Sequence, residues 1–369
     1  MPPLPSLLTT VYRNAITPLA LIRKQNTDSL GRKSLGRLGG TTFTDLKTFC
    51  NRVRKMEDQS DTFESMEGRN VYACGDVHGD LTCCCALLRL CNVVDQSGNW
   101  IGGNSIVVFC GDLLDRERKP IHLHVENTRE EVDLLHYLYD LDQKAKEHDG
   151  AVITVLGNHE LGRVFQIDHF LKNYIGQQVE GWGGKEKLKK LFRPGGDMAI
   201  YFKKRMPLIV RVGPYFFMHG GPGKKPDHNY KTLNQHLKEC LESNNKQEMM
   251  EPQHVHDVVW DRFYSEHATG TVEEKTCKQG LGTVLRDLGL PKHYKKKMGN
   301  LVIGHTIQAS LAPYCNKRVW RVDLGMSEVF KRPHLGVLKI SDNGRVVEGI
   351  VQEKKKPFEG QGRVIRLKG

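Results

Sequence analysis

Five short segments of the chain place an acid, an amide or a histidine directly beside glycine. They are Gly75-Asp76-Val77-His78-Gly79, Gly111-Asp112-Leu113-Leu114-Asp115-Arg116, Gly157-Asn158-His159-Glu160, His219-Gly220-Gly221 and Gly304-His305. Glycine lets the backbone turn sharply and approach a ligand closely. One Asp-x-His pair alone is typical of an ordinary surface loop, but five such segments in one chain indicate a shared site.

The polar residues of these segments have the chemistry of a site for two metal ions. Two carboxylates, one amide oxygen and three imidazoles suit divalent cations of intermediate hardness, with Mn²⁺ expected first and Fe or Zn as alternatives. The set contains no thiolate, which argues against a structural zinc site. Six side chains serve two ions only if one carboxylate bridges them, and Asp112 is the natural candidate. The expected ligands are Asp76, His78, Asp112, Asn158, His219 and His305.

Such a pair of cations predicts the hydrolysis of phosphate esters. Two cations about 3.5–4 Å apart can deprotonate a shared water and clamp both sides of an in-line phosphoryl displacement. Arg116 has the planar fork that grips phosphate oxygens. His159 follows Asn158 and is expected to protonate the leaving alkoxide, with Asp115 accepting its other ring N–H. His159, Asp115 and Arg116 are therefore the predicted catalytic residues.

Each segment follows a short apolar stretch that predicts a buried strand. The stretches are residues 70–74, 105–110, 151–156, 215–218 and 301–303. In α/β architectures, ligands bind at the edge where strands end. We therefore expect an α/β (α+β) fold in which these strand ends converge on the metal site.

Further elements follow from the spacing of apolar residues. Helices are predicted at 81–90, 129–148 and 160–174, and a glycine- and lysine-rich stretch at 176–200 indicates an insertion or lid. Two β-rich runs, 334–340 and 345–352, are joined by Ser341-Asp342-Asn343-Gly344, which is a strong hairpin signal.

Composition divides the chain into four expected parts. Residues 1–40 contain four prolines and six Lys/Arg against one acid, and are expected to form a basic flexible arm. Residues 41–67 should hold one amphipathic helix and a polar linker. Residues 68–352 should form the catalytic domain, and 353–369 a basic, mobile tail.

The chain of 369 residues carries a net charge of +12, which favours anionic partners: phosphorylated proteins or, through the basic termini, nucleic acid and other polyanions. Its apolar runs fall far short of the ~20 residues that a membrane span needs. Ten cysteines without a C-x-x-C pair indicate buried thiols in a reducing compartment rather than a disulfide framework. We expect a cytoplasmic protein, with an organellar location through a cleaved basic transit peptide as the alternative.

The five segments resemble, in order and over roughly residues 68–350, the motifs of the phosphoprotein phosphatase family of metallophosphoesterases. Trp260-Asp261-Arg262 and the long segment between the third and fourth motifs are similar to its Shewanella-like and bacterial branch. The resemblance implies a calcineurin-like fold, which is a central β-sandwich flanked by helices in four layers (αββα). It also implies that both metals lie at the sheet edges.

The resemblance assigns roles to individual residues. It implies that Asp76, His78 and Asp112 bind one metal, and that Asp112, Asn158, His219 and His305 bind the other. It implies the roles given above for Asp115, Arg116 and His159, and adds Arg262 as a second phosphate contact beside Arg116 and Asn158. One residue departs from the family pattern: Glu117 stands where glycine normally follows the arginine. Its Cβ and charge would crowd the turn or repel an anionic substrate.

We therefore expect a metal-dependent protein phosphatase that hydrolyses phosphoserine/threonine or phosphotyrosine. The expected mechanism is direct attack by a hydroxide that bridges the two metals, with His159 as the general acid. Two alternatives stay open. One is a hydrolase of dinucleoside polyphosphates that uses the same site, and the other is a nucleic-acid or assembly-binding protein on a phosphatase scaffold.

Overall fold

The computed structural model describes most of the chain. The described residues are 37–117, 127–242, 252–266, 271–294, 299–332, 334–353 and 363–365. Most of the expected basic arm (1–36) and most of the expected tail (354–362 and 366–369) lie outside these residues, so the expectations for those segments stay predictions.

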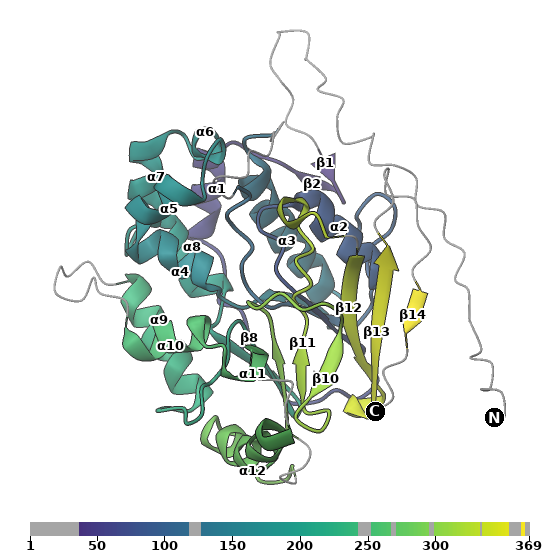
Figure 1. Ribbon diagram of the computed structural model, residues 1–369. Helices are drawn as coiled ribbons and strands as arrows, with labels where there is room; N and C mark the ends of the chain where they lie inside the picture. Colours follow the sequence, from purple (N-terminus) through teal and green to yellow (C-terminus); the bar gives the residue numbers. More distant parts are fainter. Residues whose placement is uncertain are drawn as a thin grey trace, which may run out of the picture.

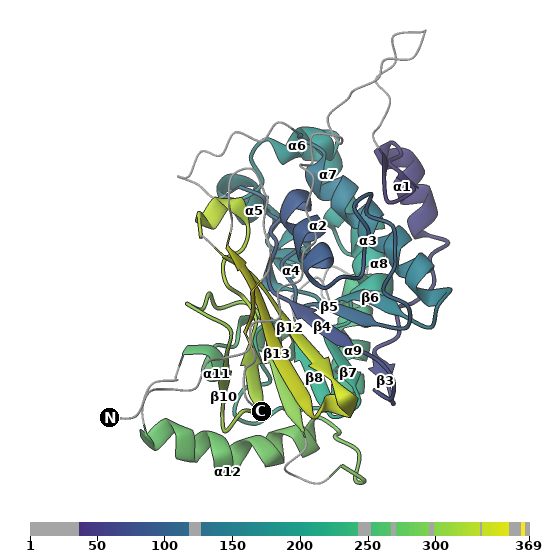
Figure 2. The same ribbon diagram turned by 90° about the vertical axis from the view of Figure 1, so that its right-hand side faces the viewer.

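Two six-stranded sheets form the centre of the structure, and one of them carries the first three motifs (Figures 1 and 2). Its strands, in spatial order, are β14 (Arg363–Ile365), β13 (Val346–Glu353), β12 (His334–Ser341), β4 (Val71–Cys74), β5 (Ile106–Phe109) and β6 (Ala151–Thr154). The predicted hairpin is present as β12 and β13. Because β4, β5 and β6 are parallel neighbours, their carboxyl ends lie at one edge of the sheet.

The second sheet carries the fourth and fifth motifs. Its strands, in spatial order, are β10 (Ala312–Tyr314), β11 (Val319–Arg321), β9 (Asn300–Ile303), β8 (Tyr215–Met218), β7 (Ile209–Val212) and β3 (Thr62–Phe63). β8 and β9 are parallel neighbours. The residues that follow these two strands therefore lie side by side.

The two sheets pack face to face over one continuous apolar core. Their close approach is visible at Gly336 of β12, where a Cβ would meet the side chains of Leu311 and Leu324, which lie next to β10 and β11. Helices α2 (Leu81–Leu90) and α3 (Glu130–Lys146) contact the first sheet, and α9 (Tyr230–Glu242) contacts the second. The expected β-sandwich flanked by helices is confirmed.

Most of the other helices gather beside the sandwich, and α4 to α10 lie on the left in Figure 1. The remaining helices are α1 (Leu46–Val53), α4 (Asn158–Phe165), α5 (Ile167–Asn173), α6 (Gln178–Gly181), α7 (Lys185–Phe192), α8 (Asp197–Arg205), α10 (Gln253–Trp260), α11 (Phe263–Glu266) and α12 (Thr271–Asp287), with the 3₁₀ turns η2 (Glu328–Phe330) and η3 (Asp342–Gly344). The expected insertion at 176–200 forms α6, α7 and the first part of α8. The single helix expected at 160–174 is instead α4 and α5, because the backbone of Gln166 leaves helical values (φ −128°, ψ 35°).

Short strands occupy segments that were expected to be arm, linker or tail. β1 (Arg37–Leu38) pairs with β2 (Thr41–Thr42), β3 pairs with β7, and β14 pairs with β13. Strands of two or three residues have too few alternating positions to be recognised from sequence. The folded unit therefore extends beyond the boundaries expected at 68 and 352.

The cysteines follow the expectation with one exception. Eight of the ten are buried thiols that form no disulfide within the described residues. Cys277 and Cys315 form a disulfide between α12 and the turn after β10, with Cα atoms 5.4 Å apart. Among the described residues, none of the helices has the length and apolar character needed to cross a membrane.

Helix α1 belongs to the main core, because Phe49 is fully buried and its ring centroid lies 4.0 Å from that of His136. We expect Phe49→Ala to lower the free energy of unfolding by about 3–5 kcal/mol, since it leaves a cavity. Lys47→Ala, at an exposed position of the same helix, is the control and should change it by less than about 0.5 kcal/mol. Urea denaturation measures both. Equal, small changes would mean that α1 is a separate appendage.

Candidate metal centre

The strand ends of both sheets converge on one cluster of polar side chains. Asp76 and His78 follow β4, Asp112 follows β5, Asn158 follows β6, His219 follows β8 and His305 follows β9. A hydrogen bond joins the two sheets here, because the backbone N–H of His305 donates to Asp76 Oδ1 at 3.3 Å. Within the second sheet, the backbone N–H of Gly304 donates to the carbonyl of His219 at 2.8 Å. The structure thus brings all six expected ligands together.

Backbone conformation aims several of these side chains. His78, Asp112, Asp115 and His305 have φ values of 44°, 49°, 69° and 65°. The left-handed region costs a residue with a Cβ about 1–2 kcal/mol, and such conformations concentrate at functional sites, where the surrounding structure holds them. Only glycine fits at position 111, because a Cβ there would lie 2.5 Å from Nδ1 of His219, which is closer than a normal contact.

Asp112 is shared between two groups of potential ligand atoms. One group is Asp112 with His78 and His159, the other is Asp112 with His219 and His305, and within each group the ligand atoms lie within 4.8 Å of one another. Asp112 Oδ2 lies 3.8 Å from His78 Nε2, and Oδ1 lies 3.3 Å from His219 Nε2. This position between two groups fits the bridging role expected for Asp112.

The hydrogen bonds of the histidines aim ring nitrogens at the centre. His219 Nδ1 donates to the carbonyl of Cys110 at 2.7 Å, and its Nε2 lies 2.8 Å from Asn158 Oδ1, to which it is hydrogen-bonded. His78 Nδ1 likewise donates to the carbonyl of Leu114 at 3.1 Å. Ligand histidines commonly have their second nitrogen fixed in this way. A bound divalent cation would take the place of the proton between His219 Nε2 and Asn158 Oδ1.

His305 gives a second indication that the residues fit metal ions. Its Nε2 is buried and has no hydrogen-bond partner. Burial, and then the neighbouring His219, lower the pKa of His305 to about 2, so the ring is neutral and keeps a lone pair. An orphaned buried nitrogen is costly unless a ligand satisfies it.

A buried network holds His159 beside this centre. Its Nδ1 donates to Asp115 Oδ2 at 2.6 Å, and its Nε2 lies 3.8 Å from Asp112 Oδ2. Arg163 donates to Asp115 Oδ1 at 2.8 and 2.5 Å and to Glu131 Oε1 at 2.6 Å. Trp182 Nε1 donates to Glu131 Oε2 at 2.7 Å. The expected His159–Asp115 pair is present, and Arg163 and Glu131 fix its orientation.

Glu160 organises the backbone of two motifs. Its carboxylate accepts hydrogen bonds from the backbone N–H groups of Gly157 at 2.9 Å, Asp112 at 3.1 Å and Leu114 at 3.0 Å. Burial, and then the charge of Asp112, raise the pKa of Glu160 to about 7. The second and third motifs are therefore held in register by one side chain.

The guanidinium of Arg116 is surrounded by carboxylates. It lies 2.9 Å from Glu328, 3.3 Å from Glu130 and 3.7 Å from Asp80, and the residue is 5% exposed. Glu130 and Asp80 are buried or nearly so, whereas the side chain of Glu328 is 59% exposed. Of the three, Glu328 is the one that solvent or a substrate can most easily displace.

Arg262 and Glu117 have defined contacts near the centre. Arg262 Nη1 donates to Thr306 Oγ1 at 2.9 Å, directly after His305. Glu117 Oε1 accepts from the backbone N–H of Gln177 at 2.9 Å, at the start of α6. The φ of Glu117 is outside the left-handed region, so the turn does not require the glycine that the family pattern has there.

Three supporting residues were missed from sequence: Arg163, Glu131 and Trp182. Arg163 lies four residues after His159 on α4, and that spacing on a helix places both on one face. It could have been found from this spacing. Glu131 and Trp182 come from α3 and from the end of α6, and no local pattern links them to the motifs.

Comparisons with known proteins agree with this geometry. The family model described as calcineurin-like phosphoesterase matches residues 69–297. Shewanella-like protein phosphatase 1 of Plasmodium berghei is 29% identical over 305 residues, which are 78% of this chain and 76% of that protein. Shewanella-like protein phosphatase 2 of Arabidopsis thaliana is 24% identical over 310 residues, which are 72% and 73% of the two chains.

A solved structure has the same fold. The cold-active protein-tyrosine phosphatase of a psychrophilic Shewanella species superposes with a TM-score of 0.60 at 19% identity, over 92% of this chain and 95% of that chain. The resemblance to the Shewanella-like branch is confirmed. Because the family model spans more than half of the chain and includes the first four motifs, this chain belongs to the calcineurin-like phosphoesterase family.

Proposed function

We propose that this phosphoesterase is a protein phosphatase that hydrolyses phosphomonoesters of serine/threonine or tyrosine at the centre around Asp112. The observation that carries the proposal is the position of Asp112 between His78 and His159 on one side and His219 and His305 on the other, with Asp115 hydrogen-bonded to His159. The Shewanella-like relatives, which are named as protein phosphatases, support this choice of substrate class. The dinucleoside polyphosphate and binding-scaffold alternatives have no comparable support.

Each side of Asp112 would hold one divalent metal ion, with Asp76 rather than His159 as the third ligand on the side of His78. We propose Asp76, His78 and Asp112 for one ion and Asp112, Asn158, His219 and His305 for the other, with Mn²⁺ as the expected metal and Fe or Zn as alternatives. When bound, such a pair activates a water as the nucleophile and neutralises charge on the phosphoryl group. The chain itself supplies the remaining functions, which are to hold the phosphoryl group and to protonate the leaving oxygen.

His159 is proposed as the proton donor. Asp115 accepts from Nδ1, so a second proton on the ring is carried by Nε2, which lies on the side of Asp112. Arg163 is paired with Asp115 at 2.5 Å and fixes that carboxylate beside Nδ1 of His159, which orients the ring. Arg116, Asn158 and Arg262 are proposed to contact the phosphoryl oxygens.

The macromolecular partner of the protein and its cellular compartment are also proposals. We propose phosphoproteins as the substrates, and a cytoplasmic location supported by the eight buried thiols outside the disulfide. The disulfide between Cys277 and Cys315 argues in the opposite direction, because disulfides are rare in the reducing cytoplasm. Nucleic-acid binding by the basic termini has no support from the described residues.

The direct test of the substrate class compares two reactions of the Mn²⁺-loaded enzyme: phosphate release from phosphopeptides, and the formation of mononucleotides (ADP, or ATP and AMP) from diadenosine tetraphosphate. We expect kcat/KM to be higher for a phosphopeptide by at least about tenfold. Asp112→Asn should abolish both activities, because it removes the shared charge. Faster hydrolysis of the dinucleotide would instead assign the enzyme to nucleotide substrates.

Loss of the proton donor should depend on the leaving group. We expect His159→Ala to lower kcat about 10²–10⁴-fold for a phosphoserine peptide, and markedly less for p-nitrophenyl phosphate, whose leaving group needs little protonation. His169→Ala, an exposed histidine on the neighbouring α5, is the matched control and should leave both rates unchanged. Equal losses on the two substrates would exclude His159 as the general acid.

Glu328 should compete with substrate for Arg116. We expect Glu328→Gln to lower KM for phosphopeptides about two- to fivefold, the range for an exposed ion pair. Glu239→Gln, an equal charge change at an exposed position of α9, controls for net charge. Steady-state kinetics at fixed ionic strength measures both. A KM that rises, or that changes equally in both variants, would argue against this competition.

A further inference from the structure

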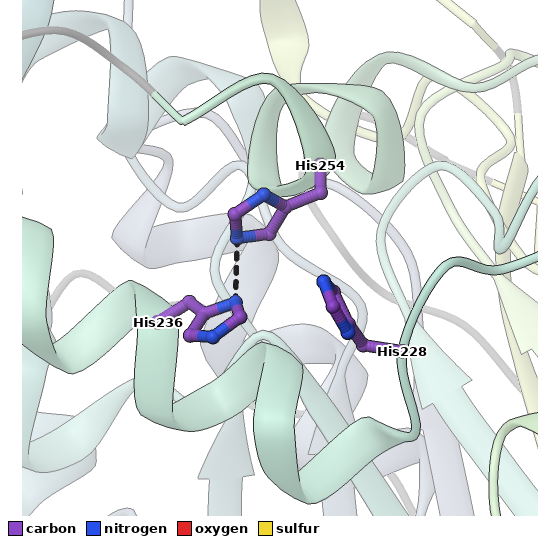
Figure 3. Close-up of side chains that lie close together, drawn as sticks. All are labelled: His228, His236 and His254. Carbon is purple, nitrogen blue, oxygen red and sulfur yellow. Dashed lines mark hydrogen bonds between the residues drawn. The ribbon is translucent and has the colours of Figure 1, made fainter.

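Three histidines meet at the junction of α9 and α10, and none of them belongs to the centre around Asp112. His228 precedes α9, His236 lies on α9 and His254 lies on the first turn of α10. Figure 3 shows the three rings turned toward one another around a common space. His228 is exposed and the other two are half-buried, so the space between the rings is accessible from solvent.

The ring nitrogens are close enough to share one ligand. One nitrogen from each histidine lies within 4.8 Å of the others. His236 Nδ1 and His254 Nε2 are 2.7 Å apart and form a hydrogen bond (Figure 3). Two imidazole nitrogens on a tetrahedral zinc ion are about 3.3 Å apart, given Zn–N bonds of about 2.0–2.1 Å. Exchange of the shared proton for a metal ion thus requires only small rotations of the side chains.

The hydrogen bond within the cluster requires at least one neutral imidazole, which is the form that binds a metal ion. A hydrogen bond between two histidines needs one ring to keep a lone pair, so both rings cannot be charged at the same time. Partial burial, and then the neighbouring His236 and His228, lower the pKa of His254. The carboxylates of Asp227 and Asp257 act on His254 in the opposite direction and would also favour a bound cation.

We propose that His228, His236 and His254 form a third metal site, which binds a borderline divalent cation such as Zn²⁺ independently of the two-metal centre. Three imidazoles without an oxygen ligand select zinc, copper or nickel over manganese, magnesium or calcium. Three protein ligands leave a fourth position for water.

The site is connected to the catalytic centre through α10. The last residue of α10, Trp260, packs edge-on against His305 with ring centroids 5.6 Å apart. The carbonyl of Val258, also near the end of α10, accepts from the backbone N–H of Gly221 at 2.9 Å, two residues after His219. A metal ion that ties the start of α10 to α9 would therefore help to hold its end against two proposed ligands of the catalytic centre.

The test counts zinc ions bound by the full-length protein after metal removal and dialysis against micromolar Zn²⁺. To separate the sites, His228→Gln is compared with its parent in both the wild-type and the Asp112→Asn backgrounds. We expect the substitution to remove one zinc ion per chain in each background. His228 is exposed, so its replacement should not disturb folding. His236→Gln should have the same effect.

His256→Gln provides the matched control, because His256 lies on α10 two residues after His254 but outside the cluster. It should leave the zinc content unchanged. Cobalt gives a second readout: the visible absorption of the Co²⁺-loaded Asp112→Asn protein should weaken in the His228→Gln variant and persist in His256→Gln. An unchanged zinc count and an unchanged cobalt spectrum in His228→Gln and His236→Gln would overturn the proposal.

Discussion

The buried charge of Asp112 is the constraint on which the rest of the centre depends. A carboxylate that is 2% exposed is costly unless positive charge or hydrogen bonds compensate it. Burial alone would raise the pKa of Asp112, but His219 and His159 hold it well below its ordinary value. These histidines come from different elements, one after β8 and the other on α4. The ends of both sheets must therefore meet at Asp112 for the charge to be compensated.

Buried carboxylates on the surrounding helices must also be compensated by positive charge and hydrogen bonds. Asp115, Arg163 and Glu131 are fully buried and form a network in which one guanidinium lies between two carboxylates. The indole of Trp182 and the backbone N–H of Asp115 add further donors to Glu131. Removal of one partner from such a network leaves an uncompensated buried charge, which typically costs about 3–5 kcal/mol. The orientation of His159 is thus linked to the packing of α3 and α4.

The sandwich and the convergence of the six polar side chains at the strand ends could be predicted from sequence because their signals are local. Each strand and the polar residue that follows it lie within about ten positions, and parallel strands bring such ends together. Contacts between distant positions carry no local signal. Glu131, Trp182 and the three-histidine cluster therefore became visible only in the folded chain. The short strands β3 and β14 were missed because two or three residues show no periodicity, and their stability comes from pairing with β7 and β13.

The central claim is that Asp112 joins two metal ions in one centre, and electron paramagnetic resonance of the Mn²⁺-reconstituted protein tests it most directly. Two Mn²⁺ ions about 3.5–4 Å apart, the spacing of two-metal hydrolases, should give the spectrum of an exchange-coupled pair. Our account predicts this spectrum after two equivalents of Mn²⁺, and its replacement in Asp112→Asn by signals of isolated ions. Isolated-ion signals in the unsubstituted protein, at every Mn²⁺ ratio, would contradict the account.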